Sequence, residues 1–240
     1  MKAIICSQYG LPNTLEYKEV EDPKPKKGEL LISIKACSVN FPDTLIIQGL
    51  YQFRPEPPFS PGSDFAGVVE EVGEGVSHFK VGDEVVGFNP YGGFAEKVTA
   101  PANVCFPKPK GMNMVNASAF LMAYGTSYHA LKDRGQVKEG DTVLVLGASG
   151  GVGITAVELA KLMGAKVIAA ASTDEKLELC FLGSTHISTG VRGAKGFIVI
   201  KESFWQTTLS FVRISWRCRS GILEGRSDRN AWAFSLVLLV

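Results

Sequence analysis

The stretch 141–160, DTVLVLGASGGVGITAVELA, constrains the fold more than any other part of the sequence. A short apolar run meets a glycine cluster, and an apolar pattern at helical spacing follows. A strand, a glycine turn and a helix in this order present backbone N–H groups and the positive helix end to a phosphate. Gly147 allows a sharp exit from the strand, and Gly153 lets helix and strand pack closely. Gly150 and Gly151 let a pyrophosphate approach the backbone.

A second apolar run, 166–170, follows this helix and completes a β-α-β unit. Glycine turns also join strands to helices that bind nothing, so the glycines alone are weak support for a ligand. The β-α-β context favours nucleotide binding, and a purely structural turn is the alternative.

The first hundred or so residues have a different pattern. Short runs with β-branched residues, separated by Pro, Gly and Lys, predict strands in 2–7, 15–20 and 29–36, and further strands within 64–88 and 93–106. This is typical of a barrel-like all-β unit. From Ala117 the spacing becomes helical, and Gly135 is expected to end that helix.

Composition excludes several classes of protein. The formal net charge of +1 gives no indication of nucleic-acid binding. The five cysteines are scattered without a CxxC pair, which indicates neither a disulfide framework nor a zinc knuckle. The N-terminus lacks a signal-peptide pattern, and the longest apolar run is too short to span a bilayer. We expect a soluble, cytoplasmic protein with no membrane partner.

The net charge of the sequence changes from negative to positive near residue 185. Residues 1–185 hold 17 Lys and Arg against 21 Asp and Glu, whereas residues 186–240 hold 8 against 3. All three tryptophans also lie in 186–240. A shifted reading frame or an alternative terminal exon would produce such a break.

An all-β unit joined by a helix to a dinucleotide-binding β-α-β unit resembles the medium-chain dehydrogenase/reductase superfamily, in its zinc-independent quinone oxidoreductase branch. The resemblance is carried, in order and with family spacing, by 35–51, 61–73, 81–88, 123–131 and 147–153. It implies an α/β protein with a chaperonin-10-like catalytic domain at 1–120 and the first part of a Rossmann nucleotide-binding domain at 121–185. Residues 186–240 depart from the family as a divergent, incompletely folded tail. The family's dimerising edge strand is missing, which puts the family-type homodimer in doubt.

The resemblance also bears on metal binding. In zinc alcohol dehydrogenases a Cys and a His hold the catalytic zinc from the regions that match 39–41 and 62–64. This chain has Asn40 and Ser63 there. An amide and a hydroxyl are poor zinc ligands beside thiolate and imidazole. We therefore expect no metal.

Without a zinc ion, the reaction that the resemblance implies is hydride transfer from NADPH to an acceptor that is already electrophilic. Such an acceptor is a quinone or an α,β-unsaturated carbonyl. The protein then has to position the reactants and donate hydrogen bonds to the developing oxyanion. By resemblance, Tyr51 and Asn40 are the catalytic candidates, with Tyr51 the best hydrogen-bond donor. The cofactor-binding candidates are Asn40, Thr126, Ser149, Gly150, Gly151, Val152, Ser172 and Lys176.

The prediction of NADPH over NADH rests on the residues at the end of the second strand of the β-α-β unit. Enzymes of this type that prefer NAD place an acidic residue there, about twenty residues past the glycine turn. That position is Ala171, which leaves room for a 2′-phosphate. Ser172 can donate a hydrogen bond and Lys176 a positive charge. Asp174 and Glu175 are expected to face solvent.

Plainer interpretations exist for the same residues. Tyr51 could be an aromatic in a Pro-rich loop, and Asn40 a turn residue before Pro42. Asp43 is expected to order the loop and not to act in acid–base chemistry. An enoyl-thioester reductase of the same superfamily, or a catalytically inert nucleotide-binding fragment, are the alternative functions.

Overall fold

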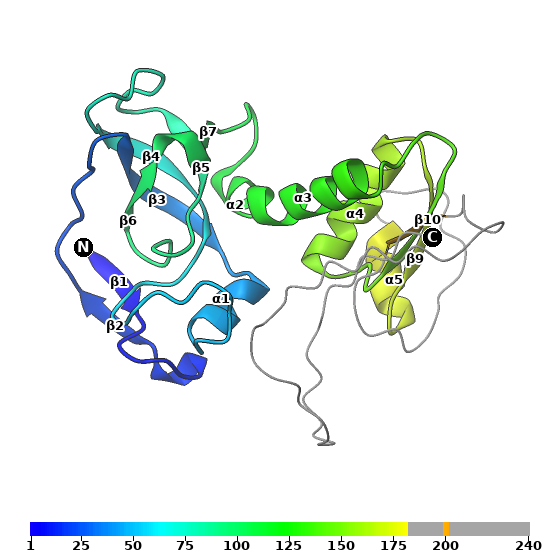
Figure 1. Ribbon diagram of the computed structural model, residues 1–240, viewed down its shortest axis with the longest axis horizontal. Helices are drawn as coiled ribbons and strands as arrows, with labels where there is room; N and C mark the ends of the chain where they lie inside the picture. Colours follow the sequence, from blue (N-terminus) through cyan, green and yellow to red (C-terminus); the bar gives the residue numbers. More distant parts are fainter. Residues whose placement is uncertain (182–198, 202–240) are drawn as a thin grey trace. The chain divides into compact units, whose positions relative to one another are not determined.

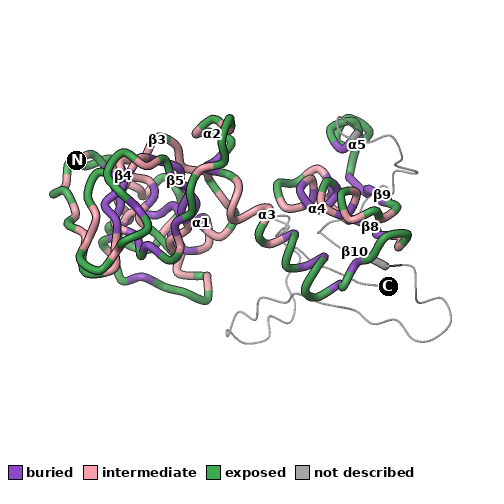
Figure 2. The backbone as a smooth tube through the Cα atoms, turned by 90° about the horizontal axis from the view of Figure 1, so that it is seen from above, coloured by how far each residue is buried: buried purple, intermediate pink, exposed green. Residues whose placement is uncertain are grey.

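A computed structural model of the chain describes residues 1–181 and 199–201. The chain divides into two compact units, Met1–Met122 and Ala123–Val240 (Figure 1). Buried positions gather on the strands of each unit and on the helix after the glycine turn (Figure 2). Each unit therefore has a core of its own.

The first unit is built on a five-stranded antiparallel sheet with the order β6-β3-β4-β5-β7. Its strands are β3 (Glu29–Ser38), β4 (Asp64–Val72), β5 (Glu84–Phe88), β6 (Lys97–Pro101) and β7 (Cys105–Pro107). A separate antiparallel pair is formed by β1 (Lys2–Ile5) and β2 (Glu16–Glu19). The short helices of this unit are η1 (Pro12–Thr14), α1 (Phe41–Ile46), η2 (Ala102–Val104) and α2 (Met114–Ser118).

The core of the first unit follows from residue alternation along the strands. Leu30 and Ile32 of β3 share one face because side chains repeat every two residues. They pack with Phe65 and Val69 of β4 and Val85 of β5, all almost fully buried. The strands expected from the sequence in this part of the chain are confirmed.

The second unit contains the β-α-β motif. It comprises β8 (Thr142–Leu146), α4 (Gly151–Leu162), β9 (Lys166–Ala170) and α5 (Asp174–Phe181). β8 and β9 pair in parallel, from Thr142 with Lys166 to Leu146 with Ala170. Apolar residues of both strands and of α4 form the core of this unit. This is the partial Rossmann-type domain that the sequence predicts.

The helix expected from Ala117 to Gly135 is interrupted. α2 ends at Ser118, and α3 (Phe120–Tyr128) continues into a π-helix, η3 (His129–Arg134). Gly135 is the C-cap, so the predicted end of the helix is confirmed.

Most of the divergent tail, residues 186–240, lies outside the described residues. Within this part of the chain the structure describes β10 (Val199–Lys201), which pairs with β8. The pairing is antiparallel, which differs from the parallel β8–β9 pair. The β-branched residues Val199 and Ile200 favour a strand at this point of the sequence. Among the residues that the structure describes, no helix is long and apolar enough to cross a membrane.

Candidate active site

The glycine turn after β8 forms an open helix start. Gly147 has a φ of +67°, a conformation that side-chain-bearing residues rarely adopt. Gly150 is the N-cap of α4; no side chain caps this helix, and its first turn holds no acidic residue. A Cβ added at Gly151 would meet nothing within 4 Å. The turn therefore has the space and the polarity to hold a pyrophosphate along Ser149, Gly150, Gly151 and Val152.

Gly153 serves packing, as the sequence predicts. A Cβ at Gly153 would lie 2.2 Å from the carbonyl oxygen of Gly147. Only glycine therefore allows α4 to leave the turn this close to the end of β8.

The end of β9 carries the residues expected to choose between NADPH and NADH. Ala171 is buried and bears no charge, whereas Ser172 and Lys176 are exposed. The Lys176 Nζ donates to the Ser172 Oγ at 3.1 Å, so the structure brings these two predicted residues together. Asp174 and Glu175 are exposed, in agreement with the sequence prediction.

Thr126 lies on α3, which is bonded to the first turn of α4. The neighbouring Ser127 is fully buried, and its Oγ donates to the carbonyl oxygen of Val152 at 2.8 Å. Ser127 also lies 2.8 Å from the hydroxyl of Thr155, which donates to the carbonyl oxygen of Ala123 at 3.2 Å. Sequence reasoning missed the pair Ser127 and Thr155. In the sequence, each of the two is a hydroxyl residue within a largely apolar stretch, and this pattern could have indicated the pair.

In the first unit, Asn40 begins α1 as its N-cap. Its backbone N–H donates to the Asp43 Oδ2 at 2.7 Å, and its side-chain amide donates to the Ser38 Oγ at 2.9 Å. The buried Asp43 also accepts a hydrogen bond from the Ser63 Oγ at 3.0 Å. Asp43 thus orders the loop, as expected, and Asn40 is held in the turn before Pro42.

Tyr51 is half-buried and packs against an apolar cluster that includes Ile46, Ile47 and Phe59. Burial raises the pKa of the Tyr51 phenol, and the nearby charge of Asp43 raises it further. Its hydroxyl therefore keeps its proton and can act as a hydrogen-bond donor. The tyrosine belongs both to the loop packing and to the candidate site.

The two positions that match zinc ligands in the alcohol dehydrogenases donate hydrogen bonds here, Asn40 to Ser38 and Ser63 to Asp43. The thiol of Cys37, near the end of β3, has a pKa raised to about 12 by burial and by the carboxylates of Asp43 and Asp64. Within 1–181 and 199–201, no three His, Cys, Asp or Glu residues come together as a metal site. That the chain works without zinc stays a prediction, and it rests on this donor chemistry.

Asp64 is a second buried carboxyl group, which sequence reasoning did not single out. It is fully buried at the start of β4, and burial raises its pKa to about 7, although N–H bonds from Met122 and Leu121 oppose this rise. The sequence could have indicated this buried carboxyl group, because an acidic residue stands directly before the apolar run FAGVV.

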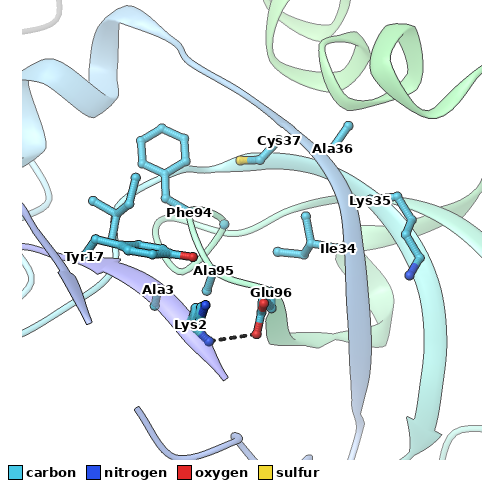
Figure 3. A pocket seen from close by; sticks show the side chains of 12 residues that line it. Lys2, Ala3, Tyr17, Ile34, Lys35, Ala36, Cys37, Phe94, Ala95 and Glu96 are labelled. Atoms are coloured by element: carbon cyan, nitrogen blue, oxygen red, sulfur yellow. Dashed lines mark hydrogen bonds between the residues drawn. The ribbon is translucent and has the colours of Figure 1, made fainter. Parts of the chain in front are cut away.

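A shallow pocket of about 330 Å³ lies elsewhere on the first unit (Figure 3). Its wall includes Tyr17, Cys37 and Phe94, and the Lys2 backbone N–H donates to Glu96 at its rim at 2.8 Å. Neither Asn40 nor Tyr51 lines it. The pocket is therefore not the candidate site.

Comparison with known proteins supports this description of the chain. Residues 26–110 match the alcohol dehydrogenase GroES-like domain. The sequence is 37% identical to a quinone oxidoreductase from Rattus norvegicus over 78% of this chain and 57% of that protein. A probable oxidoreductase from Mycobacterium abscessus is 38% identical, with a TM-score of 0.76 over 83% of this chain and 68% of that one.

The quinone oxidoreductase from Thermus thermophilus, solved also in complex with NADPH, is 38% identical with a TM-score of 0.68. The alignment covers 77% of this chain and 58% of that one. The present chain spans little more than half the length of the curated quinone oxidoreductases it matches. The expected fold, a GroES-like all-β domain followed by part of a Rossmann-type domain, is confirmed. The chain belongs to the medium-chain dehydrogenase/reductase superfamily, in its quinone oxidoreductase branch.

Proposed function

We propose that the protein is an NADPH-dependent oxidoreductase that transfers a hydride to a quinone or an α,β-unsaturated carbonyl without a metal ion. The observation that carries the proposal is the pair of features in the second unit. These are an α4 start without a side-chain cap, and a β9 end where a neutral, buried Ala171 precedes the bonded pair Ser172 and Lys176.

The residues present fit the cofactor. The backbone N–H groups of Ser149 to Val152 would hold the pyrophosphate, since no acidic side chain stands in the first turn of α4. Ser172 and Lys176 would hold the 2′-phosphate by a hydrogen bond and a charge. Thr126 and Asn40 are the further residues that the family resemblance assigns to the cofactor. When bound, NADPH supplies the hydride.

The residues of the first unit would serve the acceptor. Tyr51 keeps its proton because burial and Asp43 raise its pKa, so its hydroxyl can donate a hydrogen bond to the acceptor oxygen as negative charge develops there. Asp43 would hold Asn40 in place through the 2.7 Å bond to its backbone N–H. A conjugated acceptor needs less polarisation than a simple ketone, which is why hydrogen bonds can replace a metal here.

The cofactor preference can be tested by titrating the chain with NADPH and NADH. We expect tighter binding of NADPH. Lys176→Ala should weaken NADPH binding by roughly tenfold, the low end for a charge-assisted bond because Lys176 is exposed, and leave NADH unchanged. Lys166→Ala, the same substitution at the opposite end of β9, is the matched control and should change neither affinity.

Equal or tighter binding of NADH by the unmodified chain would show that the assignment is wrong. NADPH consumption with a panel of quinones, enones and enoyl-CoA esters separates the acceptor classes. Consumption with the esters alone would favour an enoyl-thioester reductase, and none with any acceptor would favour an inert nucleotide-binding fragment.

A further inference from the structure

Asp64 is held rigidly and completely buried. It is the first residue of β4, and it pairs with Ser38 of β3 on one side and Phe88 of β5 on the other. Its side chain therefore leaves the sheet from a fixed position. Its Oδ1 is buried without a hydrogen-bond partner in the part of the chain that the structure describes. A buried carboxyl with an unsatisfied oxygen is costly, and such groups in folded proteins call for an explanation.

The other oxygen of Asp64 meets the start of α3. The Oδ2 accepts the backbone N–H of Met122 at 3.0 Å, and the N–H of Leu121 also bonds to this carboxyl group. The first N–H groups of a helix have no partner within the helix, so Asp64 caps the start of α3 from a strand that is distant in sequence. α3 starts two residues after α2 ends at Ser118.

α3 in turn carries Thr126 one turn after Met122. Its Ala123 carbonyl oxygen accepts from Thr155 at 3.2 Å, and its Ser127 hydroxyl donates to the carbonyl oxygen of Val152 at 2.8 Å. The start of α3 is thus bonded to Asp64, and its following residues are bonded to the first turns of α4, the helix proposed to hold the pyrophosphate.

We propose that Asp64 is a positioning residue: its carboxyl group fixes the first turn of α3, the helix that carries Thr126. Thr126 matters to catalysis only if the proposed NADPH-dependent function is correct. The bond to the first turn of α3 stands independently of that function, and the two parts have separate measurements.

Hydrogen exchange at the backbone N–H groups of Leu121 and Met122 measures the cap directly in the full chain. Asp64→Ala removes the acceptor and should speed exchange at these two residues by roughly ten- to a hundredfold. Asp64→Asn keeps an acceptor oxygen at nearly the same volume and should restore most of the protection. Asp83→Asn is the matched control, because the Asp83 carboxylate accepts the Lys80 N–H at 3.0 Å in a turn and does not bond to α3.

Titration with NADPH then measures the effect on cofactor binding. Asp64→Ala should weaken NADPH binding, and Asp64→Asn should bind as the unmodified chain does. Asp64→Leu fills the space without an acceptor oxygen and should weaken binding as alanine does, which loss of packing alone would not predict. The proposal is overturned if Asp64→Ala leaves exchange at Leu121 and Met122 unchanged, or if Asp64→Asn speeds it as much as alanine does. The role in cofactor binding is overturned if Asp64→Ala binds NADPH normally. Failure of the unmodified chain to bind NADPH would contradict the proposed function while leaving the cap intact.

Discussion

The substitution Asp64→Asn should remove a large part of the pH dependence of stability. The Asp64 carboxyl group has a pKa of about 7 in the folded protein, raised chiefly by burial, whereas an aspartate in an unfolded chain titrates at about 3.9. The folded protein therefore binds this proton more tightly than the unfolded chain does. The stability that the protonated group contributes is complete below about pH 4, and it is lost as the pH rises toward about 7.

The size of the effect follows from the two pKa values. They differ by about 3, and each pKa unit corresponds to about 1.4 kcal/mol, so the loss amounts to roughly 4 kcal/mol. Full burial of Asp64 means that solvent screening does not reduce this figure much. Asparagine has nearly the same volume and does not ionise. Its amide NH2 would occupy the place of Oδ1, which has no partner, and this cost does not vary with pH.

Urea unfolding of the unmodified chain and of Asp64→Asn, at pH values from about 4.5 to 8, measures the difference. Because burial also raises the pKa of Asp43, both proteins keep some decline in stability with rising pH. The comparison between the two profiles isolates Asp64. We expect the asparagine variant to gain relative stability steadily toward pH 8. Parallel profiles across this range would refute the assignment of a neutral-range pKa to Asp64.

Three further outcomes are expected. Gly153→Ala should lower the free energy of unfolding by about 1–3 kcal/mol, because the new Cβ would lie 2.2 Å from the Gly147 carbonyl oxygen. Urea unfolding measures this change, and Gly151→Ala is the control because its Cβ would meet nothing within 4 Å. Tyr51→Phe keeps the packing and removes the donor, so kcat should fall by about a hundredfold with little change in thermal stability, and an unchanged kcat would exclude Tyr51 as the oxyanion donor. The purified chain should contain no stoichiometric zinc by elemental analysis and keep its activity in chelator; one zinc per chain that activity requires would contradict this.

Local signals in the sequence were sufficient for most of the secondary structure. The strands of the first unit, the β-α-β unit and the end of the helical stretch at Gly135 all follow from patterns spanning a few residues. The roles of Gly147 and Gly153 were also predictable, because the strand-turn-helix layout restricts both the backbone angle and the space. The role of Asp43 in ordering its loop was predictable for the same reason, because Asp43 bonds to Asn40, three residues away.

The features that were missed depend on contacts between residues far apart in the sequence. The cap of α3 comes from Asp64, 58 residues before Met122, and no local pattern indicates such a partner. The break between α2 and α3 was missed for the same reason, because the apolar spacing is continuous across Ala119. Ser127 and Thr155 are 28 residues apart, and each alone is an ordinary hydroxyl on a helix. The antiparallel placement of β10 depends on pairing with β8, which a β-branched run by itself does not specify.

Hydrogen bonds to one carboxylate connect the segments 39–41 and 62–64 of the first unit. These are the segments in which the resemblance to zinc alcohol dehydrogenases implies the zinc ligands of those enzymes. Here Asp43 accepts the N–H of Asn40 from the first segment and the hydroxyl of Ser63 from the second. Both oxygens of one buried carboxylate therefore hold the two segments together. Burial, and to a lesser degree this carboxylate, raise the pKa of Tyr51, whose hydroxyl is the group proposed to stabilise the oxyanion.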